Sequence, residues 1–247
     1  MNRGTLRGMG PGVRVPRPSG TTVDGLTLIA DSTKPDQTRW AAPDGWIPDA
    51  QIWTYASATT FTVPVDVTGY LPKGTKISYN DGAVDYGVVA STPVVSGGIS
   101  TVTLITTTDY SIASAPLTRP RYSYEALPQG WPTWFNWSPT LSGWSANPTS
   151  TAYQWSTQGP ICICSVRQGT NGTSNNAVHS ATLPGGLTLI TGGAGGGYGV
   201  DGSLSFCLNA MDADSATAGT KIIFYNPSLT NASTGTSRHI GVYTFGF

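Results

Sequence analysis

The sequence predicts an all-β protein, with two β-sandwich or barrel-like domains following an extended N-terminal arm. Composition is the first observation: 31 glycines and 18 prolines in 247 residues suit many short strands joined by turns. The second is a two-residue alternation of apolar and polar side chains, as at Phe61 and Val63 between threonines. The third is turn chemistry, above all Asn80-Asp81-Gly82, because Asp-Gly supplies the positive φ of a tight hairpin.

Residues 1–37 are predicted to form an extended basic arm. Its four arginines all precede the first acidic residue, Asp24, and are Arg3, Arg7, Arg14 and Arg17. The arm has few apolar residues with which to order itself, so it is either a disordered terminus or an anchor that becomes ordered on a partner protein. Leu26-Thr27-Leu28-Ile29 offers a strand that could add to a neighbouring sheet. Nucleic acid is disfavoured as the partner because no aromatics interleave with the arginines.

Residues 38–126 are predicted to form a small β-module. Its expected strands share short alternating patterns bounded by proline and glycine, and lie near 61–63, 77–79, 84–88, 102–106 and 121–124. Three tryptophans, Trp40, Trp46 and Trp53, open the module and are expected to pack its edge, since large aromatics dominate small β cores.

This module carries a resemblance. The quoted motifs are a Trp-Thr-Tyr opening at Trp53, Thr-Phe-Thr-Val-Pro ending at Pro64, Tyr-Leu-Pro-Lys-Gly-Thr-Lys-Ile ending at Ile77, Asp109-Tyr110 and Tyr-Ser-Tyr ending at Tyr124. Together with a Pro-Gln-Gly-Trp-Pro-Thr-Trp-Phe segment, they make residues 51–137 resemble a β-module of structural proteins of tailed bacteriophages, among them tail fibres, head fibres and minor structural proteins. The resemblance implies virion architecture and brings no catalytic residues.

Residues 127–149 are predicted to be a Trp/Pro-rich connector. Its prolines disfavour a regular helix or an inner strand, and its aromatics are Trp131, Trp134, Phe135, Trp137 and Trp144. So much aromatic surface must be buried or bound. The alternatives are packing between domains or subunits, and a stacking platform for sugar rings on a host surface.

Residues 150–247 are predicted to form a C-terminal, jelly-roll-like β-sandwich. Residues 161–166 are apolar on both faces, as expected of a strand covered by its own domain on one side and by a neighbour on the other. The final strand places Tyr243, Phe245 and Phe247 on one face, where they are predicted to form an oligomer core. The arrangement resembles the jelly-roll tips of trimeric phage fibres, which are similar in plan to the trimeric heads of tumour-necrosis-factor proteins. The glycines of 192–199 are interpreted as a flexible loop rather than a phosphate- or dinucleotide-binding loop, because no Lys-Ser/Thr pair follows them and the next segment, 204–208, is strand-like where that motif needs a helix.

Residues able to carry chemistry are few. Acid–base catalysis needs paired titratable groups, and the chain has one glutamate, Glu125, and two histidines, while Asp212 and Asp214 lie in a turn-like segment. Cys162 and Cys164 alternate on one strand and are expected, with Cys207, to be buried small hydrophobes; a zinc site formed with His179 is disfavoured because a flat Cys-x-Cys strand seldom offers the geometry. The sequence thus predicts no enzyme, cofactor or metal.

The leading hypothesis is a non-enzymatic, fibre-like virion protein that is anchored by its arm and presents a homotrimeric β head for host attachment. The alternatives are a capsid decoration, cement or head-fibre protein, and a glycan-degrading tail spike. Expected partners are other copies of the chain, capsid or tail proteins, and a host-surface glycan or protein. No membrane partner is expected, because no apolar run approaches the ~20 residues of a span. The expected location is the virion, assembled in the host cytoplasm.

Overall fold

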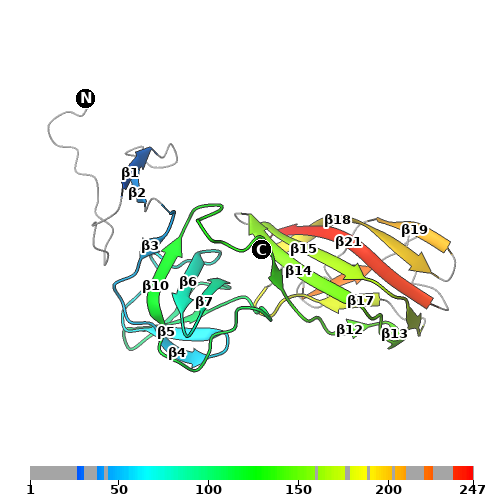
Figure 1. Cartoon of the computed structure of the whole chain (residues 1–247), viewed down its shortest axis with the longest axis horizontal. Coiled ribbons are helices and arrows are strands. Elements are labelled where there is room, and N and C mark those ends of the chain that lie inside the picture. The colour runs from blue at the N-terminus through cyan, green and yellow to red at the C-terminus, as the bar shows by residue number, and fades with distance from the viewer. Residues whose placement is uncertain are drawn as a thin grey trace.

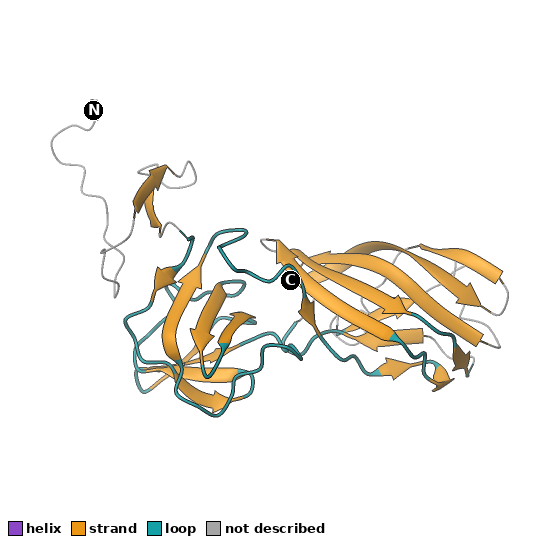
Figure 2. Ribbon diagram, viewed as in Figure 1, coloured by secondary structure: helices purple, strands orange, loops and turns teal. Residues whose placement is uncertain are grey.

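The structure, a computed structural model, describes residues 27–30, 38–41, 44–158, 161–175, 179–187, 190–201, 204–209, 220–224 and 236–246. Every regular element in these ranges is a β-strand, and all pair antiparallel, so the all-β prediction is confirmed (Figure 2). Most of the predicted arm, with Arg3, Arg7, Arg14 and Arg17, lies outside the described residues. The described part of the arm is β1 (Thr27–Ala30), which pairs with β2 (Thr38–Ala41) at the start of the predicted β-module.

The first unit contains two four-stranded sheets (Figure 1). One has the order β3 (Ile47–Pro48), β10 (Thr118–Ser123), β6 (Lys76–Asn80), β7 (Val84–Val88). The other has the order β4 (Thr54–Ser57), β5 (Thr60–Val63), β9 (Ile99–Thr103), β8 (Val94–Ser96). The predicted β6–β7 hairpin is confirmed, with Gly82 at φ 135° and its N–H donated to Asn80 Oδ1 at 3.1 Å.

Both sheets of the first unit contribute to one apolar core. Phe61 and Val63 from β5 and Ile77 from β6 have no exposed surface, as their alternation predicts. Trp53 stacks on Phe61 with ring centroids 4.3 Å apart, and its Nε1 donates to Asp49 Oδ2 at 2.8 Å. The indole is therefore held by packing on its face and by a buried carboxylate at its edge.

The second unit contains an eight-stranded and a three-stranded sheet. The larger follows the order β11 (Phe135–Asn136), β14 (Thr151–Gln158), β15 (Ile161–Gln168), β21 (Thr236–Gly246), β16 (Gly172–Ser174), β13 (Trp144–Ala146). β18 (Ile190–Asp201) also pairs with β21 and with β19 (Leu204–Asn209). The smaller sheet is β12 (Leu141–Ser142), β17 (His179–Thr182), β20 (Lys221–Phe224).

The glycine-rich segment 192–199 was predicted to be a flexible loop, and this prediction is wrong. The segment is the middle of β18, a twelve-residue strand. Its register bears on three of the six glycines in this segment. Gly195, Gly197 and Gly199 lie opposite Tyr243, Gly241 and His239 of β21. Because Tyr243 and His239 are buried, these positions belong to the inner face, where glycine leaves room for large rings on the neighbouring strand. Tertiary packing thus overrides the low strand propensity of glycine.

The sheets are several and small, and they are arranged like a propeller. The predictions of β-sandwich or barrel-like domains, and of a jelly-roll-like C-terminal domain, are therefore wrong. Alternation shows which side chains of a strand face a core, but the choice of pairing partner is non-local. β6, for example, pairs with β7 and with the distant β10, and not with β5, which precedes it.

The two units share a second apolar core. Trp46, Val88 and Ile105 from the first unit belong to the same buried cluster as Trp155 and Tyr243 from the second. The segment 127–149, predicted as a connector, runs through this cluster and contributes the short strands β11, β12 and β13. The units are therefore packed against each other through aromatic side chains.

Candidate functional site

The strongest candidate for a functional surface is the solvent side of the eight-stranded sheet. We call it the outer face and define it by Ile161, Ile163, Ile240 and Val242. Ile161 is 41% exposed, Ile240 36% and Val242 51%, while Ile163 is half-buried. The register places these residues on adjacent central strands, since Ser165 pairs with Val242 and Arg167 with Ile240. The face is thus apolar in the middle of the sheet rather than at its edge.

The other side of the same strands explains the pattern. Cys162, Cys164 and Val166 of β15 and Tyr243 of β21 are at most 1% exposed. Strand geometry sends alternate side chains to opposite faces, so the isoleucines between the cysteines must point outward. Residues 161–166 thus carry apolar side chains on both faces, apart from Ser165 on the outward one, and cover of that face by a neighbour stays a prediction. In the single chain these outward side chains remain partly exposed.

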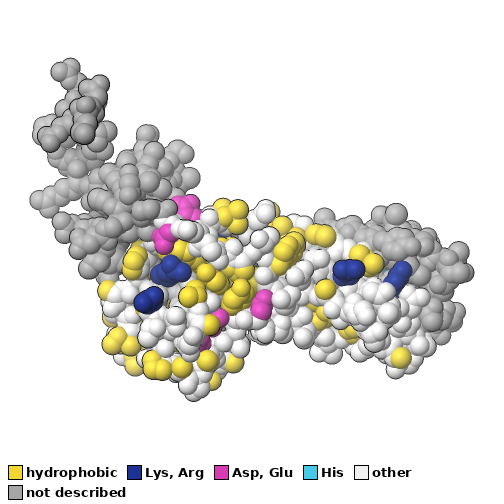
Figure 3. All heavy atoms as spheres, viewed as in Figure 1, with side chains coloured by type: hydrophobic (Ala, Val, Ile, Leu, Met, Phe, Trp, Pro, Cys, Tyr) yellow, Lys and Arg dark blue, Asp and Glu magenta, His cyan; other side chains and the backbone are white. Residues whose placement is uncertain are grey.

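Charge is sparse around the outer face. Arg167, near the C-terminal end of β15, is exposed. The half-buried Arg238 donates from Nη1 to Gly169 O at 2.7 Å. Figure 3 shows that apolar and uncharged polar side chains make up most of the visible surface of the described residues, with charges at a few separate points. Such a surface suits contact with another protein, because little charge would have to be desolvated.

The predicted aromatic contact residues lie mainly inside the chain. Phe135 stacks on Trp155 at 4.5 Å, and Trp137 Nε1 donates to Thr182 O at 3.0 Å. The buried members of the set are Trp131, Phe135, Trp137 and Trp144, all at 9% exposure or less. Of the alternatives for these four residues, packing inside the chain is the one that the structure shows, and it leaves their rings little surface for a subunit or glycan contact. Phe135 packs between the units, against Tyr110 and Trp155, whereas Trp144 packs on His179 and Phe224 within the second unit. Trp134 is half-buried.

The residues predicted to form an oligomer core also differ from that prediction where the structure describes them. Tyr243 is fully buried in the core that the two units share, so the prediction that its ring lines an oligomer core is wrong. Phe245 lies opposite Cys162 in the register, but its side chain is not among those described. Phe247 lies outside the described residues. The exposed apolar residues among the described side chains of β21 are Ile240 and Val242, and the sequence pattern does not single them out.

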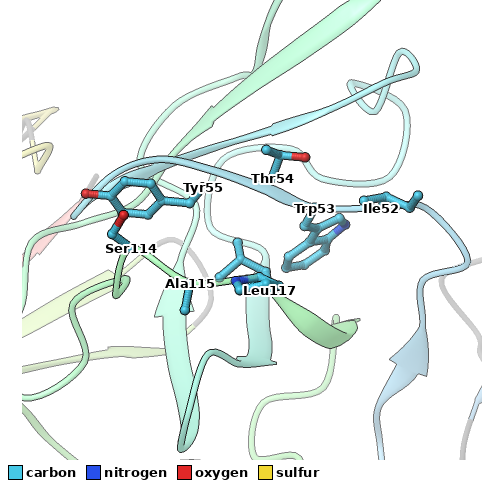
Figure 4. Close-up of a pocket in the computed structure, with 8 residues that line it drawn as sticks. Ile52, Trp53, Thr54, Tyr55, Ser114, Ala115 and Leu117 are labelled. Atoms are coloured by element: carbon cyan, nitrogen blue, oxygen red, sulfur yellow. The ribbon is translucent and has the colours of Figure 1, made fainter.

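An open recess of about 420 Å³ lies in the first unit between β4 and the segment 114–117 (Figure 4). Its lining is mainly apolar and consists of Ile52, Trp53, Thr54, Tyr55, Ser114, Ala115, Pro116 and Leu117. Trp53 is only 1% exposed and stacks on Phe61, so its ring is not a free platform for a sugar. The recess offers shape and apolar contact, but no pair of titratable groups.

The other residues considered for chemistry are separated. Glu125 lies in the first unit, whereas Asp212 and Asp214 lie outside the described residues. Cys162 and Cys164 are buried free thiols with their sulfurs 3.8 Å apart, as expected of alternate residues on one strand face. The described residues contain no cluster of three or more His, Cys, Asp or Glu suited to a metal ion.

The structure also brings together two side chains that the sequence did not connect. His179 and His239 lie 60 residues apart in the chain, yet their ring nitrogens are 2.9 Å apart in the core of the second unit. Only the pairing of β17 and β21 with their own sheets creates this contact, so no local signal could have revealed it.

Comparison with known protein families, with curated proteins and with solved structures finds no match to this chain. No candidate membrane-spanning helix occurs in the part of the chain that the structure describes.

Proposed function

We propose that this chain is a non-enzymatic structural protein of a bacteriophage virion, which assembles as a homotrimer through the outer face and projects a β head, with its basic arm as the anchor. The observation that carries the proposal is the apolar outer face on a long central sheet. A chain with 11% charged residues has little else with which to keep such a face in water. Covering it with a second copy satisfies both sides of β15.

The resemblance of residues 51–137 to a module of phage structural proteins supports the virion setting and the threefold symmetry. Closed symmetry is also what an exposed sheet face needs, because a closed ring of subunits leaves no apolar face to recruit further copies. In this proposal the protein contacts a host-surface glycan or protein with loops of the second unit.

The first test is the native mass of the purified protein and of Val242→Lys. Val242 is half exposed at the centre of the outer face, so a lysine there would place a charge in the subunit contact. We expect wild type to sediment as three chains of 25.8 kDa and Val242→Lys as one chain. The control is Val94→Lys, which introduces the same charge at a 67% exposed valine of β8 in the first unit and should leave the trimer intact.

A monomeric wild type, or a Val242→Lys protein that remains trimeric, would contradict assembly through this face. Detection of the chain by mass spectrometry in gradient-purified phage particles would support the virion setting. Loss of capsid binding on removing residues 1–37 would favour capsid decoration over a tail fibre. Hydrolysis of host polysaccharide by wild type would contradict the non-enzymatic role.

A further inference from the structure

The core of the second unit contains two imidazoles in direct contact, and they are the chain's only histidines. His179 is on β17 of the three-stranded sheet and His239 is on β21 of the eight-stranded sheet. They are 0% and 1% exposed, and His179 Nδ1 lies 2.9 Å from His239 Nε2. This hydrogen bond connects the two sheets through side chains, in a place where the surrounding contacts are aromatic.

Each ring is stacked on an aromatic side chain. Trp144 covers His179 with ring centroids 4.0 Å apart and planes within 19°, and Phe224 covers His239 at 4.4 Å and 12°. Such stacking fixes the ring planes and excludes water from both imidazoles. A proton added here would therefore enter a site without solvent to stabilise its charge.

The polar partners define which nitrogens carry protons. His179 Nε2 lies 3.2 Å from Ser174 Oγ, while His239 Nδ1 is buried without a partner. A buried orphan acceptor costs less than an orphan N–H. The favoured neutral state thus has His239 Nε2–H donating to His179 Nδ1, and His179 Nε2–H donating to Ser174.

Protonation is opposed at both rings. A proton on His239 Nδ1 would be a charged donor without an acceptor, and a proton on His179 Nδ1 would point at the N–H of His239 and break the contact. Burial, with the charge of His179 as a second cause, lowers the pKa of His239 from 6.5 to about 3. The neutral pair is therefore the state that fits the folded core.

No carboxylate that the structure describes faces the pair from the surrounding strands. β13, β15, β16 and β20 present uncharged groups to it, namely Trp144, Gln168, Ser174 and Phe224. Gln168 Oε1 accepts the backbone N–H of His239 at 2.7 Å. On β21 the nearest titratable groups are Arg238 and Tyr243, and Lys221 stands at the start of β20. β18 has Gly199 opposite His239, and Asp201 lies opposite Ser237.

We propose that the His179–His239 pair is a proton-sensitive latch, which holds the three-stranded sheet to the eight-stranded sheet while both imidazoles are neutral and releases it when they take up protons. The direction of this pH dependence follows from the linkage between proton binding and opening of the latch. In the open state each histidine titrates near its ordinary value of about 6.5. Opening therefore takes up protons below that pH, and each proton favours opening by about tenfold per pH unit. The proposal does not depend on self-association.

The primary test uses wild-type protein labelled with ¹⁵N in histidine. We expect both rings to remain neutral from pH 7.5 to below 6 while the core is folded, with the His239 Nε2–H tautomer. Titration of either ring near pH 6.5 in a folded core would overturn the proposal, because the latch would not exclude protons.

The second test is regional hydrogen exchange at pH 7.5 and 4.5, corrected for the intrinsic pH dependence of exchange. We expect the opening equilibrium of β17 and β21 to rise by tenfold or more, while β5 and β9 in the first unit serve as the internal reference. In His179→Asn/His239→Gln, the amides can replace the acceptor and the donor but cannot take up the proton, so this rise should disappear. An unchanged opening of β17 and β21 in wild type, or the same rise in the double variant, would contradict the latch.

Discussion

At the scale of single residues, the first unit contains a carboxyl pair in which one member is held protonated. Asp81 is in the β6–β7 turn and accepts the backbone N–H of Ala113 at 2.6 Å through Oδ2. Asp85 is opposite Tyr79 in the register and partly buried. Burial, together with the hydrogen bond and the charge of Asp81, raises the pKa of Asp85 to about 7. The pair therefore ionises fully only above neutral pH.

This pair predicts a stability that falls as the pH rises from about 4 to about 7, that is, between the unfolded and the folded pKa of Asp85. The folded pKa of Asp85 is above its unfolded value, so its contribution is present at low pH and is lost as the pH rises through 7. Asp85→Asn should remove this slope and gain most over wild type at pH 8. Urea unfolding of both proteins at several pH values measures the difference, which we expect to be below about 1 kcal/mol because solvent screens the site.

The matched control for Asp85→Asn is Asp66→Asn. Hydrogen bonds from Thr68 lower the pKa of Asp66, so this carboxylate stays ionised throughout that pH range. Its replacement should shift the unfolding curves equally at every pH. A slope that persists in Asp85→Asn would show that another group causes it.

At the scale of elements, the alternation of apolar and polar side chains predicts where strands lie, but it does not predict which strands pair. The sequence correctly indicates β5, β6, β7 and β10, because their apolar residues recur every second position, and β15, because it is a short, nearly continuous apolar run. It does not indicate β14, whose outward positions are occupied by polar residues and alanine, or β18, whose glycines make sense only beside Tyr243 and His239. The missing information is which strand becomes the neighbour of which.

The close approach of β16 to the segment before β14 gives a prediction at this scale. A Cβ on Gly172 would lie 2.6 Å from Ala146 O and 2.7 Å from Pro148 N. Backbone atoms cannot move away as a flexible side chain would, so Gly172→Ala should destabilise the protein by about 1–3 kcal/mol. Gly69→Ala is the control, since a Cβ there meets nothing within 4 Å.

Chemical denaturation of the two alanine variants provides the measurement. Gly69→Ala should unfold within about 0.5 kcal/mol of wild type. Equal stability of Gly172→Ala and wild type would mean that β16 does not pack as closely as the structure places it.

At the scale of the whole molecule, the sequence predicts two domains and a connector, whereas the structure has two units joined by a common core. The aromatics of 127–149 were correctly identified as too apolar to be exposed without a partner. The sequence could not identify that partner, because the rings that receive them come from both before and after the segment in the chain, as Tyr110 and Trp155 on Phe135 show. Trp46 and Trp131 lie 6.0 Å apart, and Phe135 meets Tyr110 at 5.6 Å.

This shared core predicts that the two units unfold together. Phe135 is fully buried and contacts Tyr110 of the first unit and Trp155 of the second. Phe135→Ala should cost about 3–5 kcal/mol through the lost contacts and the cavity. It should also separate one unfolding transition into two, as followed by tryptophan fluorescence and circular dichroism.

Phe135→Leu is the control, because it retains most of the volume and should keep a single transition at a smaller cost. Two transitions in the wild-type protein would show instead that the units are independent despite their common core.

The shared core also has a mechanical meaning. A hinge needs a segment whose backbone can rotate without breaking contacts, and the segment between these units is wedged between rings on both sides. A load applied to one unit would therefore be transmitted to the other by compression of stacked aromatics rather than by bending of a linker. The two units should therefore move as one rigid body, so that a force applied to the distal end of the long strands is transmitted to the sheets of the first unit.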